Sequence, residues 1–285
     1  MLRTRALVLF FLCFGYARAQ DEQVLFSPED RIIFDRLIQE ADVEGSASLG
    51  EVIVAAGREL LNTPYVAGTL EGHNPEILIV NLRGLDCTTF VENVLVVAAM
   101  SEEGQKEWDT YLRQLERLRY RDGIRRGYPS RLHYFTGWIR NNAKKGLVED
   151  ITQSLGGLPL EKRIDFMGTH PDLYPALSSE AALEAVQKVE QELSEQVTYI
   201  LPREEVSEVE NQIQNGDIIA LATSIDGLDV THTGFAFRKD NGHLHLLHAS
   251  TRGSVEISKA PLADYLQGVK GNTGIIVVRP LESRD

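Results

Sequence analysis

The chain has 285 residues with 42 acidic and 29 basic side chains, a formal net charge of −13 at pH 7. This acidic balance disfavours a nucleic-acid partner, because the phosphate backbone attracts basic surfaces. With 43% hydrophobic residues the composition is that of a globular protein that can bury a sizeable core.

The first 19 residues have the pattern of a secretory signal peptide. Arg3 and Arg5 precede an apolar run at 6–14 that is too short to span a bilayer, and a small-x-small motif at 17–19 predicts cleavage before Gln20. We therefore expect an exported protein of the bacterial periplasm or cell surface, without stable membrane insertion. An uncleaved anchor is the alternative. Cleavage removes three arginines and no acid, so the charge becomes −16.

Apolar periodicity predicts mostly helices in the first two thirds of the chain and strands in the last third. The predicted helices are 28–41, 49–61, a buried one at 87–100, amphipathic ones within 101–150, and 179–195; the predicted strands are 76–82, 217–222, 233–238, 243–249 and 274–278. This order indicates an α+β fold. Because no Pro- or Ser-rich linker divides the chain, we expect residues 20–285 to form a single domain with a large helical insertion at about 101–210.

Cys87 stands at the predicted start of the buried helix and is the only cysteine left after removal of residues 1–19. A helix N-terminus favours a thiolate, which is the nucleophilic form of cysteine. The flanking Asp86 and Thr88 make this helix start polar, which suits a cleft better than a core. The alternative is an inert, buried small side chain.

Four of the seven histidines fall within one predicted hairpin. A three-residue loop at 240–242, with Gly in the left-handed position, pairs Gly234 with His248. His232 and His248 then become diagonal neighbours on one face, with small side chains that leave room for a helix or substrate above them. A four-residue loop would separate the two rings, so this prediction depends on the register.

These residues predict a Cys87–His232–His248 triad: Cys87 attacks, His232 takes its proton and later protonates the leaving amine, and His248 orients His232. A zinc site built on the His-x-His at 243–245 is the rival hypothesis. Strand alternation separates that pair from His248, so we predict no metal or cofactor and interpret the pair as exposed or half-buried strand residues.

These motifs together resemble the NlpC-type cell-wall cysteine peptidases and amidases, a papain-like superfamily. The matching segments are Asp-Cys-Thr-Thr-Phe-Val at 86–91, His-Thr-Gly-Phe at 232–235, His-Ala-Ser at 248–250, Thr-Pro-Tyr-Val-Ala-Gly at 63–68 and Asn-Gly-Asp-Ile at 215–218. The resemblance implies a papain-like core, in which the Cys lies on a buried helix packed on an antiparallel sheet or half-barrel. It also places Tyr65 at the cleft, although Ala-Gly-Thr at 67–69 departs from the usual Trp-Gly-Gly.

Within that group the chain is most similar to the bacterial N-acetylmuramoyl-L-alanine amidase-like family, on Ser-Arg-Leu-His-Tyr-Phe at 130–135 and Phe-Met-Gly-Thr-His-Pro at 166–171. The resemblance implies a peptidoglycan or muropeptide substrate, cut either between muramic acid and L-alanine or within the stem peptide. A silent envelope glycopeptide-binding protein is the third hypothesis. The candidate substrate-binding residues are Tyr65, Arg83, Asp86, Thr88, His133 and His170. For Arg83 and Asp86, a turn arginine and a helix-start carboxylate are equally good interpretations.

Overall fold

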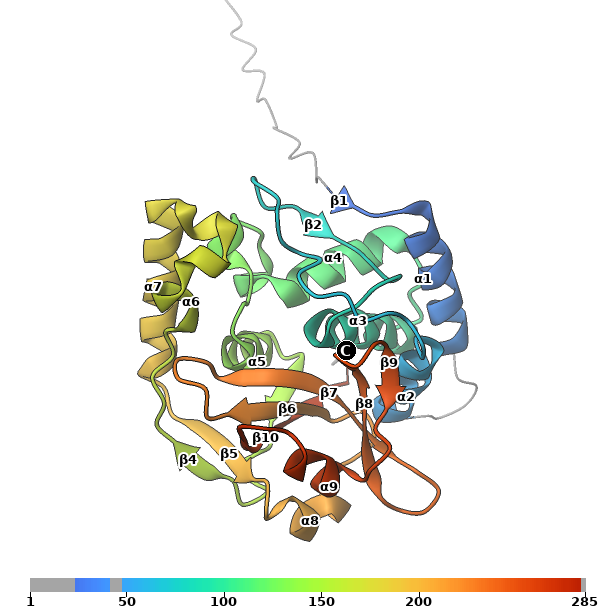
Figure 1. The fold of residues 1–285 in the computed structure, drawn as a ribbon. Coiled ribbons are helices and arrows are strands. Elements are labelled where there is room, and N and C mark those ends of the chain that lie inside the picture. The colour runs from blue at the N-terminus through green and yellow to red at the C-terminus, as the bar shows by residue number, and fades with distance from the viewer. Residues whose placement is uncertain (1–23, 42–47, 283–285) are drawn as a thin grey trace, which may run out of the picture.

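A computed structural model describes residues 24–41 and 48–282 (Figure 1). The predicted signal peptide and its cleavage site lie outside the described residues. The fold is mixed α/β, built on a large antiparallel sheet with the strand order β4-β5-β10-β6-β7-β8-β9, and β3 pairs with β10 as well. Among the described residues, no helix combines the length and the apolar character needed to cross a bilayer.

Five strands of the sheet come from residues 218–280, and the sequence predicts all of them except the short edge strand at 255–257. They are β6 (Ile218–Thr223), β7 (Val230–Arg238), β8 (Leu244–Ala249), β9 (Val255–Ile257) and β10 (Asn272–Pro280). Alternate residues of these strands enter two different hydrophobic clusters, because successive side chains point to opposite faces. The sheet is therefore buried on both faces.

One face of the sheet carries the predicted N-terminal helices, drawn mostly above it in Figure 1. These are α1 (Pro28–Ala41), α2 (Leu49–Glu59) and α3 (Cys87–Glu102). Helix α3 packs there through Phe90, whose ring centroid lies 5.8 Å from that of Phe235 in β7. Helix α3 is apolar nearly all round because it is surrounded, with eleven of its residues buried.

The opposite face is covered by α8 (Val206–Val209) and α9 (Leu262–Gln267), below the sheet in Figure 1. Leu262 and Leu266 of α9 share a cluster with Ala236 and Leu246. The small-residue face of the hairpin is thus covered by a helix, one of the two expected occupants, and this helix is α9, whereas the cysteine helix packs on the Phe235 face. Strand periodicity identifies the two faces but does not say which helix will cover each.

The segment 101–210 is not purely helical. It contains α4 (Trp108–Arg119), α5 (Phe135–Lys144), α6 (Phe166–Thr169) and α7 (Glu180–Ser194), and also β3 (Val148–Asp150), β4 (Leu158–Leu160) and β5 (Thr198–Pro202). Both β3 and β5 pair with β10, so the segment extends the main sheet. The three strands have three to five residues each, too short to show a period in the sequence.

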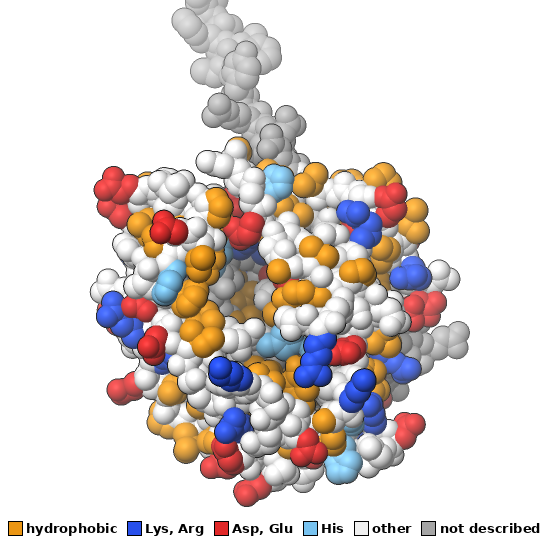
Figure 2. All heavy atoms as spheres, in the orientation of Figure 1, with side chains coloured by type: hydrophobic (Ala, Val, Ile, Leu, Met, Phe, Trp, Pro, Cys, Tyr) orange, Lys and Arg blue, Asp and Glu red, His pale blue; other side chains and the backbone are white. Residues whose placement is uncertain are grey.

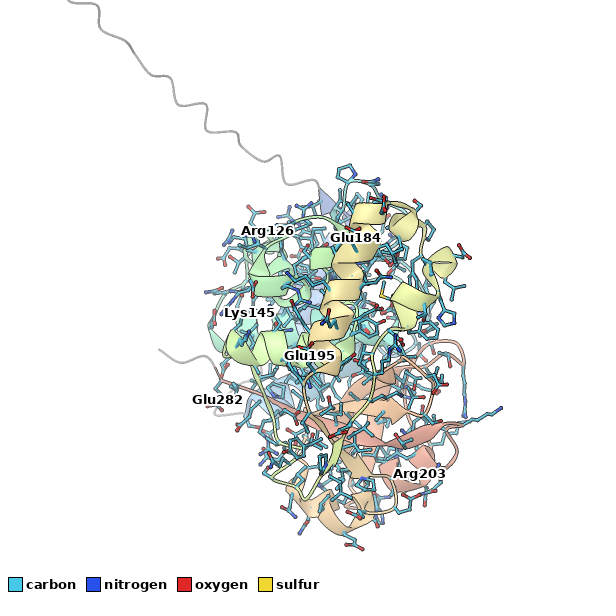
Figure 3. All side chains as sticks on the ribbon, turned by 90° about the vertical axis from the view of Figure 1, so that its left-hand side faces the viewer. Arg126, Lys145, Glu184, Glu195, Arg203 and Glu282 are labelled. Carbon is cyan, nitrogen blue, oxygen red and sulfur yellow. The ribbon has the colours of Figure 1, made fainter. Side chains whose placement is uncertain are left out.

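Helix α7 forms the outer side of this segment, where Figure 3 shows Glu184 and Glu195 toward opposite ends of the helix. Behind it lies a separate small core that includes Tyr128, Tyr134 and Val186. The predicted strand at 76–82 is shorter than expected: only β2 (Leu78–Ile79) pairs, in parallel with β1 (Val24–Leu25).

A buried ion pair joins α3 to its neighbours. Arg119 of α4 donates from Nε to Glu92 Oε2 of α3 at 2.7 Å, and from Nη1 to the Ile79 carbonyl at 2.6 Å. Trp138 of α5 donates from Nε1 to the second Glu92 oxygen at 3.3 Å. One carboxylate on the cysteine helix therefore anchors that helix to α4 and α5.

Candidate active site

The start of α3 is stabilised by a capping box, in which Asp86 and Thr89 form hydrogen bonds to each other. Asp86 accepts a hydrogen bond from the Thr89 backbone N–H at 2.8 Å and another from the Thr89 hydroxyl at 2.8 Å. The Asp86 backbone N–H in turn donates to Thr89 Oγ1 at 2.9 Å. This capping box makes Cys87 the first helical residue and holds its backbone in one position. It also favours the helix-start interpretation of Asp86 over a substrate-binding one.

The Cys87 thiol lies beside strand β7. Burial, and then the neighbouring Asp86 carboxylate, raise the pKa of Cys87 to about 11, although hydrogen bonds from the Thr233 backbone and from Thr88 favour the thiolate. Hydrogen bonds at the helix start thus lower the pKa of Cys87 as expected, but desolvation and the like charge of Asp86 outweigh them. The thiol is protonated at rest and requires a base.

The hairpin has the register that the sequence predicts. Lys239 and His243 face each other across the turn, with the Lys239 N–H donating to the His243 carbonyl at 3.0 Å, and Gly242 has φ +85°. The register places Phe235 opposite Leu247, and hence Gly234 opposite His248.

As a result, His232 Nε2 lies 2.6 Å from His248 Nδ1, with the ring planes at 85°. The two imidazoles share a hydrogen bond.

Gly234 makes room for this pair. A Cβ atom at Gly234 would lie 2.7 Å from His248 Cβ and 2.7 Å from the Leu247 carbonyl oxygen. The strands therefore approach each other closely at the point where the His248 side chain leaves β8.

Both rings are neutral at neutral pH. Burial and then the neighbouring His248 lower the pKa of His232 to about 3, and burial and then the Arg252 charge lower the pKa of His248 to about 4. Because Nε2 of His232 is engaged by His248, Nδ1 is the nitrogen left to accept a proton. A neutral imidazole with one free ring nitrogen can act as a general base.

The start of β7 is fixed from the inserted segment. Asp229 accepts hydrogen bonds from the backbone N–H of Thr136 at 2.7 Å and from its hydroxyl at 2.8 Å. Thr136 lies in the first turn of α5, and Asp229 directly precedes β7. Three residues before His232, the strand is thus attached to α5.

Two tyrosines lie near the Cys87–His232–His248 group. The Tyr65 N–H donates to the Gly253 carbonyl at 2.8 Å, and Tyr65 bridges to Leu85 beside the α3 start. Burial, followed by the charges of Cys87 and Asp86, raises the pKa of Tyr65 to about 12, so its hydroxyl remains a donor. From α9, the Tyr265 ring lies 5.4 Å from the His248 ring. Burial raises the pKa of Tyr265 against the lowering effect of Arg252, and the charges of Glu256 and Cys87 add to the rise.

The sequence motif at 63–68 points to Tyr65, whereas nothing in the sequence points to Tyr265, because a lone aromatic residue in a six-residue helix carries no distinguishing pattern.

The remaining predicted residues have partners of their own. Arg83 Nε lies 3.1 Å from Asp30 Oδ1 of α1, which favours the structural interpretation of this arginine. His133 Nε2 is 2.9 Å from the Tyr128 carbonyl, and burial lowers the pKa of His133 to about 3. His170 is exposed and stacks on Phe166 at 4.4 Å. None of the described contacts joins His133 or His170 to the Cys87–His232–His248 group.

The two other hairpin histidines differ in burial, although alternation predicts that they share a face away from His248. His243 is exposed, but His245 is buried, with Nδ1 2.8 Å from the Ser258 carbonyl oxygen, so the expectation of a half-exposed ring is wrong for His245. Among the described residues no three His, Cys, Asp or Glu side chains converge as metal ligands would.

The molecular surface is hollowed near the centre of the face in Figure 2, between the lobe formed by α6 and α7 and the part that carries α3. Histidine spheres lie at the lower edge of this hollow, near strand β7. Acidic and basic side chains lie at its upper edge. This face of the molecule is therefore hollowed beside strands of the sheet, as a ligand-binding surface would be.

Comparison with known proteins gives the family. The model of the AmiA-like family, described as N-acetylmuramoyl-L-alanine amidase-like, matches residues 55–275. The chain belongs to this amidase-like family of peptidoglycan hydrolases. No curated protein sequence matches the chain.

Three solved structures are similar to the chain, and one of them carries the amidase name. An N-acetylmuramoyl-L-alanine amidase from Bacteroides uniformis is 38% identical, with a TM-score of 0.78 over 83% of this chain and 100% of the other. A Bacteroides fragilis protein named provisionally as a xylanase is 41% identical, with a TM-score of 0.73 over 78% of this chain and 98% of its own. A Legionella pneumophila protein at 21% identity shares the fold, with a TM-score of 0.64 over 88% and 95%.

Proposed function

We propose that the protein is an exported cysteine amidohydrolase of the NlpC-type papain-like group that cleaves the amide bond between muramic acid and L-alanine. One arrangement of side chains carries the proposal. The Cys87 thiol forms a hydrogen bond with the backbone of Thr233, which follows His232 in the sequence. The His232 ring in turn lies 2.6 Å, Nε2 to Nδ1, from the His248 ring. The amidase-like family and the Bacteroides uniformis amidase support the choice of substrate.

In the proposed reaction His232 removes the thiol proton as sulfur attacks. The Cys87 proton passes to His232 Nδ1 while Sγ forms a bond to the amide carbonyl carbon, and the carbonyl electrons become an oxyanion. The oxyanion then collapses, the C–N bond breaks, and the leaving amine takes the proton from His232. Water attacks the resulting thioester with His232 again as base, which releases the carboxylic acid and restores the Cys87 thiol.

Two groups near Cys87 can serve as donors to the oxyanion. The Cys87 backbone N–H belongs to the first turn of α3, where amide groups have no partner within the helix. The Tyr65 hydroxyl remains protonated beside the thiol, since burial raises the pKa of Tyr65 to about 12. Preorganised donors of this kind stabilise a tetrahedral intermediate.

The test is mass spectrometry of products from defined muropeptides. The proposal predicts release of intact stem peptide from muramyl peptides, no cleavage of stem peptides that lack the sugar, and no product with Cys87→Ala. Cleavage of sugar-free peptides would identify a stem-peptide endopeptidase instead. Full activity of Cys87→Ala would exclude the cysteine mechanism, and activity lost to a chelator and restored by zinc would support the zinc hydrolase.

Export is tested separately. N-terminal sequencing of the protein recovered from the cell envelope should begin at Gln20. A chain that retains residues 1–19 would support the uncleaved anchor.

A further inference from the structure

The outer nitrogen of His248 lacks a hydrogen-bond partner. His248 has 1% of its surface exposed, and Nδ1 faces His232, whereas Nε2 is buried and unpaired among the described residues. Leaving a buried polar nitrogen unpaired costs stability, so such an atom calls for an explanation. The facing carboxylate is that of Glu256, whose Oε1 lies 4.0 Å from Nε2.

Glu256 is held at that place by the sheet. Strands β8 and β9 are antiparallel with His248 directly opposite Glu256, so both side chains leave the same face of the sheet. The Glu256 side chain is 37% exposed and extends from solvent toward the buried ring. A rotation of the Glu256 side chain can shorten the 4.0 Å distance between Glu256 Oε1 and His248 Nε2 to that of a hydrogen bond, or one water can bridge the two atoms.

We propose that Glu256 is a positioning residue that completes a Cys87–His232–His248–Glu256 relay. The proposal rests on the function proposed above and adds a fourth member to it. Glu256 acts through His248 and does not touch the scissile bond.

The positions of the protons give the reason. To accept the Cys87 proton at Nδ1, neutral His232 must carry its single proton on Nε2 and donate it to His248 Nδ1. His248 must then carry its own proton on Nε2, which points toward Glu256. A carboxylate at that place selects this tautomer of both rings and offsets the positive charge that His232 gains when sulfur is deprotonated.

The charges around the pair show why a carboxylate is needed. His248 is faced by His232 from β7, by Arg252 from the β8–β9 loop, by the neutral Tyr265 from α9, and by Glu256 from β9. Arg252 lowers the pKa of His248, so without Glu256 the imidazoles would face only a cation and neutral groups. Glu256 is the group in this set that can stabilise an imidazolium.

The test compares Glu256→Gln with Glu256→Asp, and uses the exposed Glu184→Gln on α7 as the matched control. Because Glu256 is partly exposed and screened, we expect Glu256→Gln to lower kcat by roughly 3- to 10-fold with KM nearly unchanged. Glu256→Asp should recover part of the loss, and Glu184→Gln should match the unchanged protein. Thermal unfolding checks that all three variants are folded.

A second readout needs no substrate. The rate of Cys87 alkylation by iodoacetamide, followed across pH by mass spectrometry of its peptide, reports formation of the thiolate–imidazolium pair. Glu256→Gln should slow alkylation at neutral pH by a factor similar to its loss of kcat. An unchanged alkylation profile, or a rise in KM alone, would overturn the relay. The proposed function fails on a different result, which is activity retained by Cys87→Ala, so the two failures are distinguishable.

Discussion

Gly234→Ala tests whether close strand approach holds the histidine pair together. The added Cβ would lie 2.7 Å from both His248 Cβ and the Leu247 carbonyl oxygen. Comfortable carbon contacts begin at about 3.5 Å, so the strands must separate by roughly 0.8 Å. The backbone atom cannot rotate away, and overpacking of this kind costs about 1–3 kcal/mol. The same displacement should lengthen the 2.6 Å contact between His232 and His248.

The assay pairs urea unfolding with the alkylation rate of Cys87. We expect Gly234→Ala to lose about 1–3 kcal/mol of unfolding free energy and most of its thiol reactivity at neutral pH. Gly137→Ala in α5 is the matched control, because its Cβ would meet only Leu193 methyl groups at 3.5 Å. That change should be neutral or stabilising by about 0.5–1 kcal/mol. A Gly234→Ala protein with unchanged stability and reactivity would refute the reasoning.

Two further substitutions test the packing around the site. Arg119→Met leaves the Glu92 carboxylate buried without its cation, and urea unfolding should show a loss of about 3–5 kcal/mol; a loss below about 1 kcal/mol would contradict this. His133→Gln addresses acid stability. Burial lowers the pKa of His133 from 6.5 to about 3, so the unfolded chain binds a proton that the folded chain does not, and stability falls as pH drops below 6.5. The variant should flatten this fall between about pH 6.5 and 4 without slowing Cys87 alkylation; an equally steep fall would argue against the assignment.

Local patterns carried the most reliable predictions. The loop at 240–242 sets the register of its own hairpin, so the His232–His248 contact followed from a few neighbouring residues. The buried helix at 87–100 was predictable because its residues are apolar nearly all round, which is typical of a helix surrounded by other elements. In both cases the determining interactions lie within one or two elements.

Features that depend on the packing of elements distant in the sequence were not predictable. The thiol pKa depends on how much solvent β7 excludes from Cys87, and the α3 sequence does not contain that information. Tyr265 reaches His248 from a helix 17 residues further along the chain. The short strands β3, β4 and β5 form because neighbouring strands offer unpaired edges, since their own three to five residues show no clear period.

The link from Asp229 to Thr136 has a consequence for protein engineering. It ties the strand of the proposed base to the inserted segment, while β3 and β5 of that segment are hydrogen-bonded to β10. Removing residues 101–210 to obtain a shorter protein would remove the support of strand β7 together with two strands that pair with β10. The inserted segment is thus part of the scaffold, and shortened versions must replace that anchorage before they can be expected to turn over substrate.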